Sequence, residues 1–203
     1  MSSARILVIG TRNAGKLQEI RSILGGIAWQ IRSLRDFSAI EPPAETGSTY
    51  AENASLKGVY YASTLGEWAL ADDSGLEVAA LNGAPGLYSA RYAGGGASDS
   101  DRRQLLLTEL RGRATVNRSA RFVCAVGIAA PDGTVKNISE GICGGTIIDE
   151  ERGDGGFGYD PLFCPDGYDQ TFAQLSEEVK DRISHRARAL AGARKFLQEL
   201  EIG

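Results

Sequence analysis

The fold class is decided by the opening of the chain, where residues 6–17 read ILVIGTRNAGKL. The apolar run at 6–9 is typical of a short, fully buried strand, and the glycines that bound 10–15 indicate a turn. Apolar residues then recur at helical spacing, at positions 17, 20, 23 and 24, until Gly25 and Gly26 end the helix. A strand, a turn and a helix in this order predict an α/β protein.

The turn also carries chemistry, because residues 10–16 nearly match the phosphate-binding pattern GxxxxGK[ST]. Leu17 stands where that pattern needs a hydroxyl for magnesium, which argues against a kinase or an ATPase. What remains is a helix N-terminus with Asn13 as a small donor and Lys16 as a positive charge, a combination that suits a polyphosphate. A structural turn with a solvated lysine is the alternative for this segment.

The rest of the chain continues the alternation of strands and helices. In chain order we expect a helix from Thr49, capped through Glu52, a strand over 68–71 that ends in Asp72-Asp73-Ser74-Gly75, an ordered loop over 83–96, a helix from Ser98, strands over 121–130 and 135–148 joined by a hairpin turn, and a helix from Ser184. The early alternation followed by a hairpin predicts a mixed α/β sheet rather than a purely parallel one.

Composition bounds the class of protein. The 203 residues are 42% hydrophobic and 24% charged, as in an ordinary globular protein, and predict a single domain over 1–203, with two lobes around a cleft as one form of it. Lys plus Arg is 22 and Asp plus Glu is 26, so the net charge of −4 disfavours nucleic acid or an anionic membrane as a partner.

Cysteine usage and apolar runs indicate the compartment. The three cysteines, Cys124, Cys143 and Cys164, form no CxxC pair, so reduced, buried thiols are expected rather than a zinc site. No apolar run is long enough for a signal-peptide core or a membrane span. We therefore expect a cytoplasmic protein.

Two adjacent carboxylates, Asp72 and Asp73, stand where the central strand is expected to open into a loop. Such a pair is costly to bury unless a cation holds it, and oxygen ligands suit Mg²⁺ or Mn²⁺. Glu45 is a candidate third carboxylate, and Lys57 shares a helix face with Asn53 four residues earlier. An Asx-type turn at Asp72 and a solvated stripe at Lys57 are the alternatives.

Two later segments are candidates for ligand binding. Residues 153–158 satisfy GxGxxG, but no helix is expected to follow, so they indicate a loop that a ligand approaches closely, with Phe157 as a flat face and Asp160 as an acceptor. Ser184-His185-Arg186 opens the last helix after Lys180 and Arg182, which sets cations against the positive end of the helix dipole. Packing at Phe157 and an incidental histidine are the alternatives.

Seven motifs occur in order along the chain: TRNAGK at 11–16, ETG at 45–47, ENASLK at 52–57, ADDSG at 71–75, GAPGLYSARYAG at 83–94, GGFGYDPLF at 155–163 and SHR at 184–186. Together they closely resemble the inosine triphosphate pyrophosphatase family, from about residue 5 to residue 201. The resemblance implies an elongated mixed α/β sheet with two lobes flanking a substrate cleft, and a homodimer. It also implies magnesium-dependent hydrolysis of ITP, dITP and XTP to the monophosphate and pyrophosphate.

The resemblance further implies a role for each matched position. Asp73 is the implied catalytic base, and the implied metal ligands are Glu45, Asp72 and Asp73. The implied substrate contacts are Thr11, Arg12, Asn13, Ala14, Gly15, Lys16, Lys57, Ser74, Phe157, Gly158, Tyr159, Asp160, Lys180, His185 and Arg186. Arg12 departs from the small residue that many members carry.

Two other function classes fit the same residues. A non-catalytic purine nucleotide sensor would need no carboxylate cluster, and a phosphotransferase would need a hydroxyl at position 17. The three carboxylates and Leu17 therefore favour a hydrolase, in which a carboxylate orients or deprotonates water for attack on the α-phosphorus. Donors such as Arg186 would then donate hydrogen bonds to the oxo group of the purine, whereas adenine's amino group would leave these donors unpaired.

Overall fold

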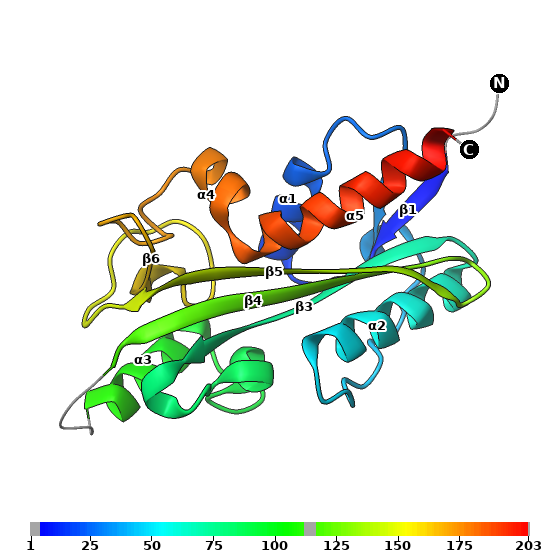
Figure 1. Ribbon diagram of the computed structural model, residues 1–203. Helices are drawn as coiled ribbons and strands as arrows, with labels where there is room; N and C mark the ends of the chain where they lie inside the picture. The colour runs from blue at the N-terminus through cyan, green and yellow to red at the C-terminus, as the bar shows by residue number, and fades with distance from the viewer. Residues whose placement is uncertain (1–4, 112–116, 203) are drawn as a thin grey trace. The chain divides into compact units, whose positions relative to one another are not determined.

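A computed structural model describes residues 5–111 and 117–202 and divides them into two compact units. Unit 1 comprises residues 5–73, 124–141 and 186–202, and unit 2 comprises 74–111, 117–123 and 142–185. Three long strands contribute residues to both units (Figure 1).

The strands form one mixed sheet, in the order β2-β1-β3-β4-β5-β6. Their bounds are β1 Ile6–Ile9, β2 Gln30–Ser33, β3 Trp68–Val78, β4 Ser119–Ala129, β5 Val135–Ile147 and β6 Phe163–Pro165. β1 pairs in parallel with β2 and with β3, whereas β5 and β6 are antiparallel. The prediction of a mixed α/β sheet is therefore confirmed.

Five α-helices lie within the described residues: α1 Ala14–Ile23, α2 Tyr50–Leu65, α3 Asp99–Arg111, α4 Glu177–Ile183 and α5 His185–Ile202. Capping side chains fix where several of them begin. Thr49 accepts a hydrogen bond from the backbone N–H of Glu52 at the start of α2, and Ser98 does the same for Asp101 at the start of α3. α2 ends at Gly66, whose φ of 67° is left-handed.

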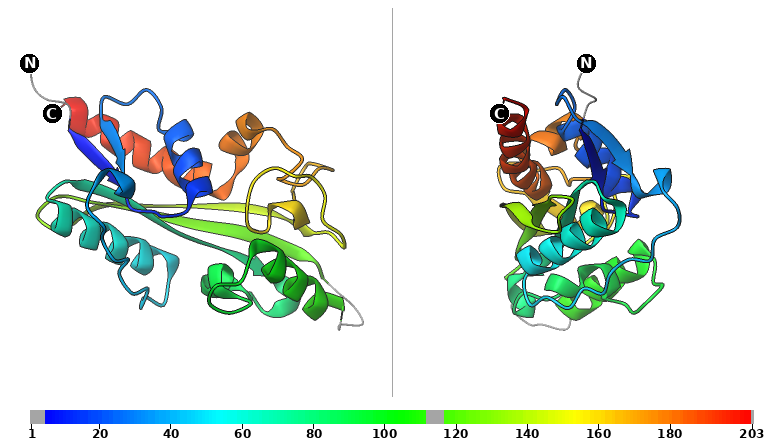
Figure 2. Two further views of the ribbon diagram at one scale, coloured as in Figure 1. Left: turned by 180° about the vertical axis from the view of Figure 1, so that it is seen from behind. Right: turned by 90° about the vertical axis from the view of Figure 1, so that its right-hand side faces the viewer.

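In unit 1, helices cover both faces of the sheet. α1 and α5 pack on one face, with Leu24 and Leu190 in one apolar cluster with Leu7 and Leu70 of the strands. α2 covers the opposite face and packs through Tyr61 and neighbouring alanines (Figure 2). This arrangement places the N-terminus of α1 and the buried face of α2 beside the same central strand, β3.

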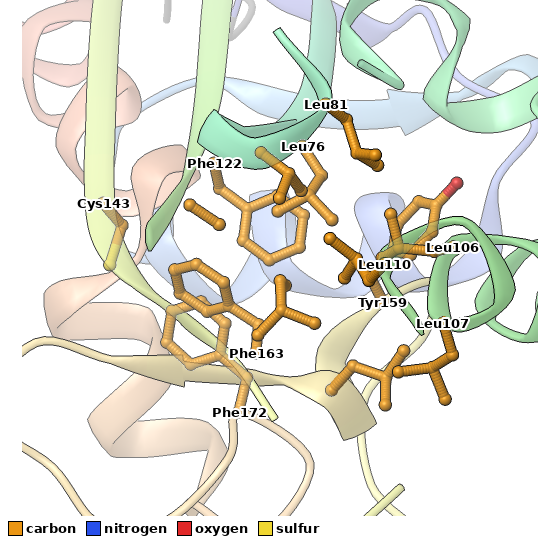
Figure 3. Packing of buried hydrophobic residues seen from close by; sticks show 14 residues of the cluster. Leu76, Leu81, Leu106, Leu107, Leu110, Phe122, Cys143, Tyr159, Phe163 and Phe172 are labelled. Carbon is orange, nitrogen blue, oxygen red and sulfur yellow. The ribbon is translucent and has the colours of Figure 1, made fainter. Parts of the chain in front are cut away.

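Unit 2 has its own apolar core, which α3 covers with three leucines (Figure 3). Phe122 is at its centre, with the rings of Phe163 and Phe172 at centroid distances of 4.7 and 6.1 Å. Tyr159 joins this core through its ring and donates from its hydroxyl to the carbonyl of Ser89 at 2.9 Å. The loop that holds Tyr159 is thereby anchored in the core of unit 2.

The end of the central strand differs from the sequence prediction. β3 does not end at Ala71 but continues through Asp72, Asp73, Ser74 and Gly75 to Val78. The two carboxylates are tolerated inside a strand because positively charged side chains from other elements neutralise them, so no turn is needed to expose them to water.

The last helix, α5, begins at His185 and carries Arg186 in its first turn, as expected. Lys180 and Arg182, which precede it, lie in the last turn of a separate helix, α4, where a positive charge is favourable. The sequence reasoning missed this seven-residue helix, as well as the short strands β2 and β6.

All three cysteines are free; Cys124 and Cys143 are buried as expected, and Cys164 is only half-buried. Across residues 5–111 and 117–202, no helix combines the length and apolar character needed to cross a bilayer.

A close contact between β4 and α2 gives a first testable prediction. A Cβ added at Gly127 would lie 3.0 Å from the carbonyl oxygen of Ala54 and 3.2 Å from the backbone nitrogen of Ser55. Gly127→Ala should therefore push α2 away from β4 and lower the free energy of unfolding by about 1–3 kcal/mol, measured by urea denaturation. Gly95→Ala is the control, because its Cβ would meet no atom within 4 Å. Equal stabilities of the two variants would contradict this close packing.

Candidate active site

The turn at 10–16 forms a capped helix N-terminus in unit 1. The side-chain oxygen of Asn13 accepts from the backbone N–H of Lys16 at 2.9 Å, so Asn13 acts here as an acceptor rather than the expected donor. The backbone N–H of Asn13 in turn donates to Thr11 Oγ1 at 3.2 Å, and Arg12 donates to the carbonyl of Ile40. No acidic residue lies in the first turn of α1, so the positive end of its dipole is available to an anion.

Asp72 is the most buried carboxylate of the site, with its side chain 1% exposed. Its Oδ2 atom accepts from Lys16 Nζ at 2.9 Å and from Arg186 Nη2 at 3.1 Å. Its Oδ1 atom is buried without a hydrogen-bond partner in the part of the chain that the structure describes. Burial raises the pKa of Asp72, but the charges of Lys16 and Arg186 outweigh it and hold the pKa below its usual value. Asp72 is therefore ionised at neutral pH.

Arg186 is buried between two carboxylates of unit 1. Its guanidinium donates to Asp72 and to Glu19 of α1, and its side chain is 1% exposed. Burial lowers the pKa of Arg186, but the two carboxylates outweigh it and raise the pKa above its usual value. The recognition of a base by Arg186 stays a prediction, since these contacts are with protein groups.

Asp73 faces a second cation on the α2 side of β3. Lys57 Nζ lies 2.9 Å from Asp73 Oδ1 and 2.9 Å from Glu45 Oε1. The Asn53 amide accepts from the backbone N–H of Gly47 at 2.8 Å and donates to Asp73 Oδ2 at 3.2 Å. Burial raises the pKa of Asp73 above its usual value, although Lys57 opposes the shift. The face of α2 that carries Asn53 and Lys57 is thus turned toward Asp73 and is not a solvated stripe.

The same residues fit a magnesium ion. No three side chains of the metal-binding types gather around one point in the described residues. Mg²⁺ nevertheless commonly takes only one or two carboxylates, with waters and substrate phosphates as its other ligands. Glu45 and Asp73 already meet at one cation, the Lys57 ammonium, and Asp72 presents a buried oxygen atom without a partner. Hard oxygen donors of this kind are suited to Mg²⁺.

In unit 2, the predicted residues of the glycine-rich loop surround a buried ion pair. Asp160 Oδ2 accepts from Lys180 Nζ at 2.5 Å and from the backbone N–H of Phe157 at 2.8 Å. The Lys180 ammonium also lies 4.8 Å from the centroid of the Phe157 ring. Gly156 permits this arrangement, because a Cβ there would lie 2.2 Å from Asp160 Oδ2.

The remaining predicted residues of unit 2 are His185, Ser184 and Ser74. His185 is 4% exposed and stacks on Phe122, with ring centroids 4.7 Å apart and an angle of 12° between the planes. Ser184 ends α4 by donating its backbone N–H to the carbonyl of Lys180 at 3.0 Å. Ser74 is half-buried on β3.

Three residues that the sequence reasoning did not place in the site take part in it. Asn53 orients Asp73, Glu19 binds Arg186, and Cys124 places its Sγ 4.0 Å from Asp72 Oδ2. Burial raises the pKa of Cys124 to about 12, and the charge of Asp72 adds to this, so the thiol stays protonated. Local signals were available for two of them: Asn53 lies four residues before Lys57 on α2, and Glu19 lies about one turn after Lys16 on α1.

A capped helix N-terminus beside half-buried lysines and the buried carboxylates Asp72 and Asp73 is typical of α/β proteins that bind a phosphorylated ligand at the end of a helix. Comparison with known proteins gives the family within that class. The model of the Ham1 family matches residues 7–196, and the chain belongs to this family. The resemblance stated from the seven motifs is thereby confirmed.

Individual relatives agree with the family assignment. The chain is 50% identical to a dITP/XTP pyrophosphatase from Desulfotalea psychrophila over 186 aligned residues. The aligned stretch covers 92% of this chain and 82% of the relative. Among solved structures, it resembles a HAM1 protein from Coxiella burnetii with a TM-score of 0.87 and 39% identity, covering 96% of this chain and 99% of that one. The Ham1 protein of Staphylococcus aureus gives a TM-score of 0.84 and 41% identity, with coverage of 97% and 100%.

The buried ion pairs of Asp72 give a prediction for stability against pH. Asp72→Asn should lower the free energy of unfolding by about 3 kcal/mol near neutral pH, because Lys16 loses its carboxylate partner and the buried Arg186 keeps only Glu19. Since the pKa of Asp72 is lowered in the folded protein, its contribution is present above about pH 4 and is lost as the pH falls. The difference in the free energy of unfolding between wild type and variant should therefore be smaller by about 1 kcal/mol at about pH 3 than at neutral pH, measured by urea denaturation.

The matched control is Asp149→Asn, whose side chain is 79% exposed and which should follow wild type at both pH values. A gap for Asp72→Asn that is as wide at about pH 3 as at neutral pH would contradict the assignment of an ionised Asp72.

Proposed function

We propose that this chain is a pyrophosphohydrolase that converts the non-standard purine nucleotides ITP, dITP and XTP to the monophosphate and pyrophosphate, and so removes deaminated purines from the nucleotide pool. The dITP/XTP pyrophosphatase that is 50% identical to it supports this reaction. The observation that carries the proposal is the pairing of Lys16 with Asp72 and of Lys57 with Asp73 beside the N-terminus of α1. This group combines positive charge for a triphosphate with carboxylates for hydrolysis.

The triphosphate is proposed to bind at residues 11–16, where backbone N–H groups and the helix dipole favour an anion. Lys16 and Lys57 would share its negative charge. Burial lowers the pKa of Lys57, but Asp73 and Asp72 outweigh it and raise the pKa above its usual value, so the ammonium is protonated at neutral pH.

Magnesium is the proposed cofactor, with manganese as a substitute, and Glu45, Asp72 and Asp73 would hold it. When bound, the ion would neutralise charge on the phosphates. The two lysines carry the rest of that charge, and they are held in place by the same carboxylates.

Asp73 is the proposed base. Its raised pKa suits a group that accepts a proton, and Asn53 fixes the direction of its carboxylate. In the proposed step, the water oxygen bonds to the α-phosphorus, the bond from that phosphorus to the bridging oxygen breaks, and pyrophosphate leaves. The proton of the water passes to Asp73.

The purine is proposed to bind at Phe157–Asp160, His185 and Arg186, with Ser74 as a further contact to the substrate. Lys180 is proposed to contact the phosphates. Buried donors that face an oxo group at the six-position would be left unpaired by the amino group of adenine, and this penalty discriminates between the bases. Within unit 2, the loop at 157–160 is held by the ion pair of Asp160 and Lys180.

Two further proposals rest on the family resemblance. The chain is proposed to form a homodimer and to act in the cytoplasm, where nucleoside triphosphates are abundant. Sedimentation at micromolar concentration would distinguish a dimer from a monomer.

Replacement of the proposed base tests the mechanism. Asp73→Asn should reduce kcat for dITP by at least about a thousandfold while dITP still binds, because the amide keeps the shape but cannot accept the proton. Turnover is measured by pyrophosphate release, and binding by calorimetry. The control is Glu52→Gln on α2, next to Asn53; Glu52 accepts from Ser48 rather than contacting Asp73, so the variant should keep wild-type kcat. Near-normal turnover of Asp73→Asn would remove Asp73 as the base.

Removal of metal tests the cofactor separately. Chelation of divalent cations should abolish pyrophosphate release from dITP, and added Mg²⁺ or Mn²⁺ should restore it, because three carboxylates are proposed to hold the ion. Thermal melting with and without Mg²⁺ gives a second readout, in which the ion should raise the melting temperature. Full turnover in the presence of chelator would contradict the proposed cofactor.

A further inference from the structure

Gly158 lies within the proposed purine-binding loop, and side chains of one helix, α3, bind both its backbone N–H and its carbonyl. Asp99 Oδ2 accepts from the backbone N–H of Gly158 at 2.8 Å, and Arg103 Nη1 donates to the carbonyl of Gly158 at 2.8 Å. Asp99 and Arg103 are four residues apart in α3, so both side chains lie on one face of that helix. α3 thus hydrogen-bonds to both the backbone donor and the backbone acceptor of a single residue.

Gly158 adopts a backbone conformation that favours glycine, although there is room for a larger side chain. Its φ is +61°, a left-handed value that side chains other than that of glycine rarely adopt. A Cβ added there would meet no atom within 4 Å. The glycine is therefore required by the path of the loop and not by lack of space.

Asp99 and Arg103 are themselves held by ion pairs with other side chains. Asp99 also pairs with Arg102, and Arg103 pairs with Glu151 at 2.9 Å. Burial raises the pKa of Asp99, but the hydrogen bonds from Arg102 and from the Gly158 N–H outweigh it and lower the pKa. The acceptor is thus an ionised carboxylate, which makes the stronger kind of hydrogen bond.

The neighbours of Gly158 on either side are the groups that the loop presents. Phe157 precedes it and carries the Lys180 ammonium on its ring, and Tyr159 follows it and reaches the carbonyl of Ser89. A rotation of the backbone at Gly158 would change the direction of both neighbouring side chains at once. The two hydrogen bonds from α3 therefore set how the loop faces a ligand.

We propose that Asp99 and Arg103 are positioning residues for purine specificity, which hold the loop at Gly158 in the one geometry that discriminates an oxo-purine from an amino-purine. The inference rests on the proposed function, because it needs the loop at 157–160 to face the base. Discrimination by hydrogen bonding requires rigid donors, and a loop that can shift accommodates the wrong base more easily.

The test compares kcat and KM for dITP and dATP in variants of the full chain. Asp99→Ala and Arg103→Met should each raise KM for dITP and lower the ratio of kcat/KM for dITP over dATP about tenfold, with kcat for dITP changed less than about threefold. Gly158→Ala should lower the ratio in the same way, because it disturbs the peptide without touching α3 and its methyl group enters open space.

Two matched controls separate positioning from general damage to α3. Asp99→Asn keeps an oxygen that accepts from the Gly158 N–H, so it should retain most of the wild-type ratio of kcat/KM for dITP over dATP that Asp99→Ala loses. Glu151→Gln removes the ion pair with Arg103 but leaves the two hydrogen bonds to Gly158, and its ratio should stay within about twofold of wild type. A ratio unchanged in both Asp99→Ala and Arg103→Met would overturn the inference, as would a loss in Glu151→Gln equal to that in Arg103→Met.

Failure of the proposed function would look different. Wild-type protein without any preference for dITP over dATP, or a Phe157→Ala variant that keeps the full preference, would show that this loop does not read the base. A wild-type preference that depends on Phe157 but not on Asp99 or Arg103 would overturn the positioning role alone.

Discussion

The structure of unit 1 depends on the buried carboxylate of Asp72. It lies in the central strand, and its charge is balanced by Lys16 from α1 and by Arg186 from α5. A buried ion pair of this kind contributes little net stability compared with apolar packing, yet loss of one partner is costly because the other stays charged. Asp72 therefore fixes the start of α1, the middle of β3 and the start of α5 in one arrangement. The proposed phosphate site is built on that arrangement.

The two units orient their functional groups by the same physical device, a pair of side chains four residues apart on a helix. In unit 1, Asn53 and Lys57 of α2 fix both oxygens of Asp73. In unit 2, Asp99 and Arg103 of α3 fix both backbone polar groups of Gly158, its N–H and its carbonyl. Polar groups that are held from two sides lose little further freedom when a ligand binds, which favours specificity.

Sequence reasoning found the elements whose signals are local. The capping residues Thr49 and Ser98 placed two helices, and the capped turn before Lys16 was recognised from its spacing. It wrongly ended β3 at Asp72, because Asp, Ser and Gly favour turns and the cations that neutralise Asp72 are distant in the chain. It missed β2, in which Ile31 is the one strongly apolar residue, and α4, which is shorter than a clear helical period requires. The partners of Arg186 are likewise set by tertiary contacts and have no local pattern.

The central claim is that the lysines and carboxylates beside α1 hydrolyse the triphosphate of an oxo-purine between the α- and β-phosphates. The most direct measurement is a product assay with Mg²⁺ on ITP, XTP, dITP, ATP and GTP that separates pyrophosphate from orthophosphate. Monophosphate and pyrophosphate are expected from ITP, XTP and dITP, with ATP nearly untouched because its base carries an amino group at the six-position. GTP should also be nearly untouched, because its base adds an amino group at the two-position. Orthophosphate released from ATP, or tight binding of ITP without turnover, would contradict the central claim.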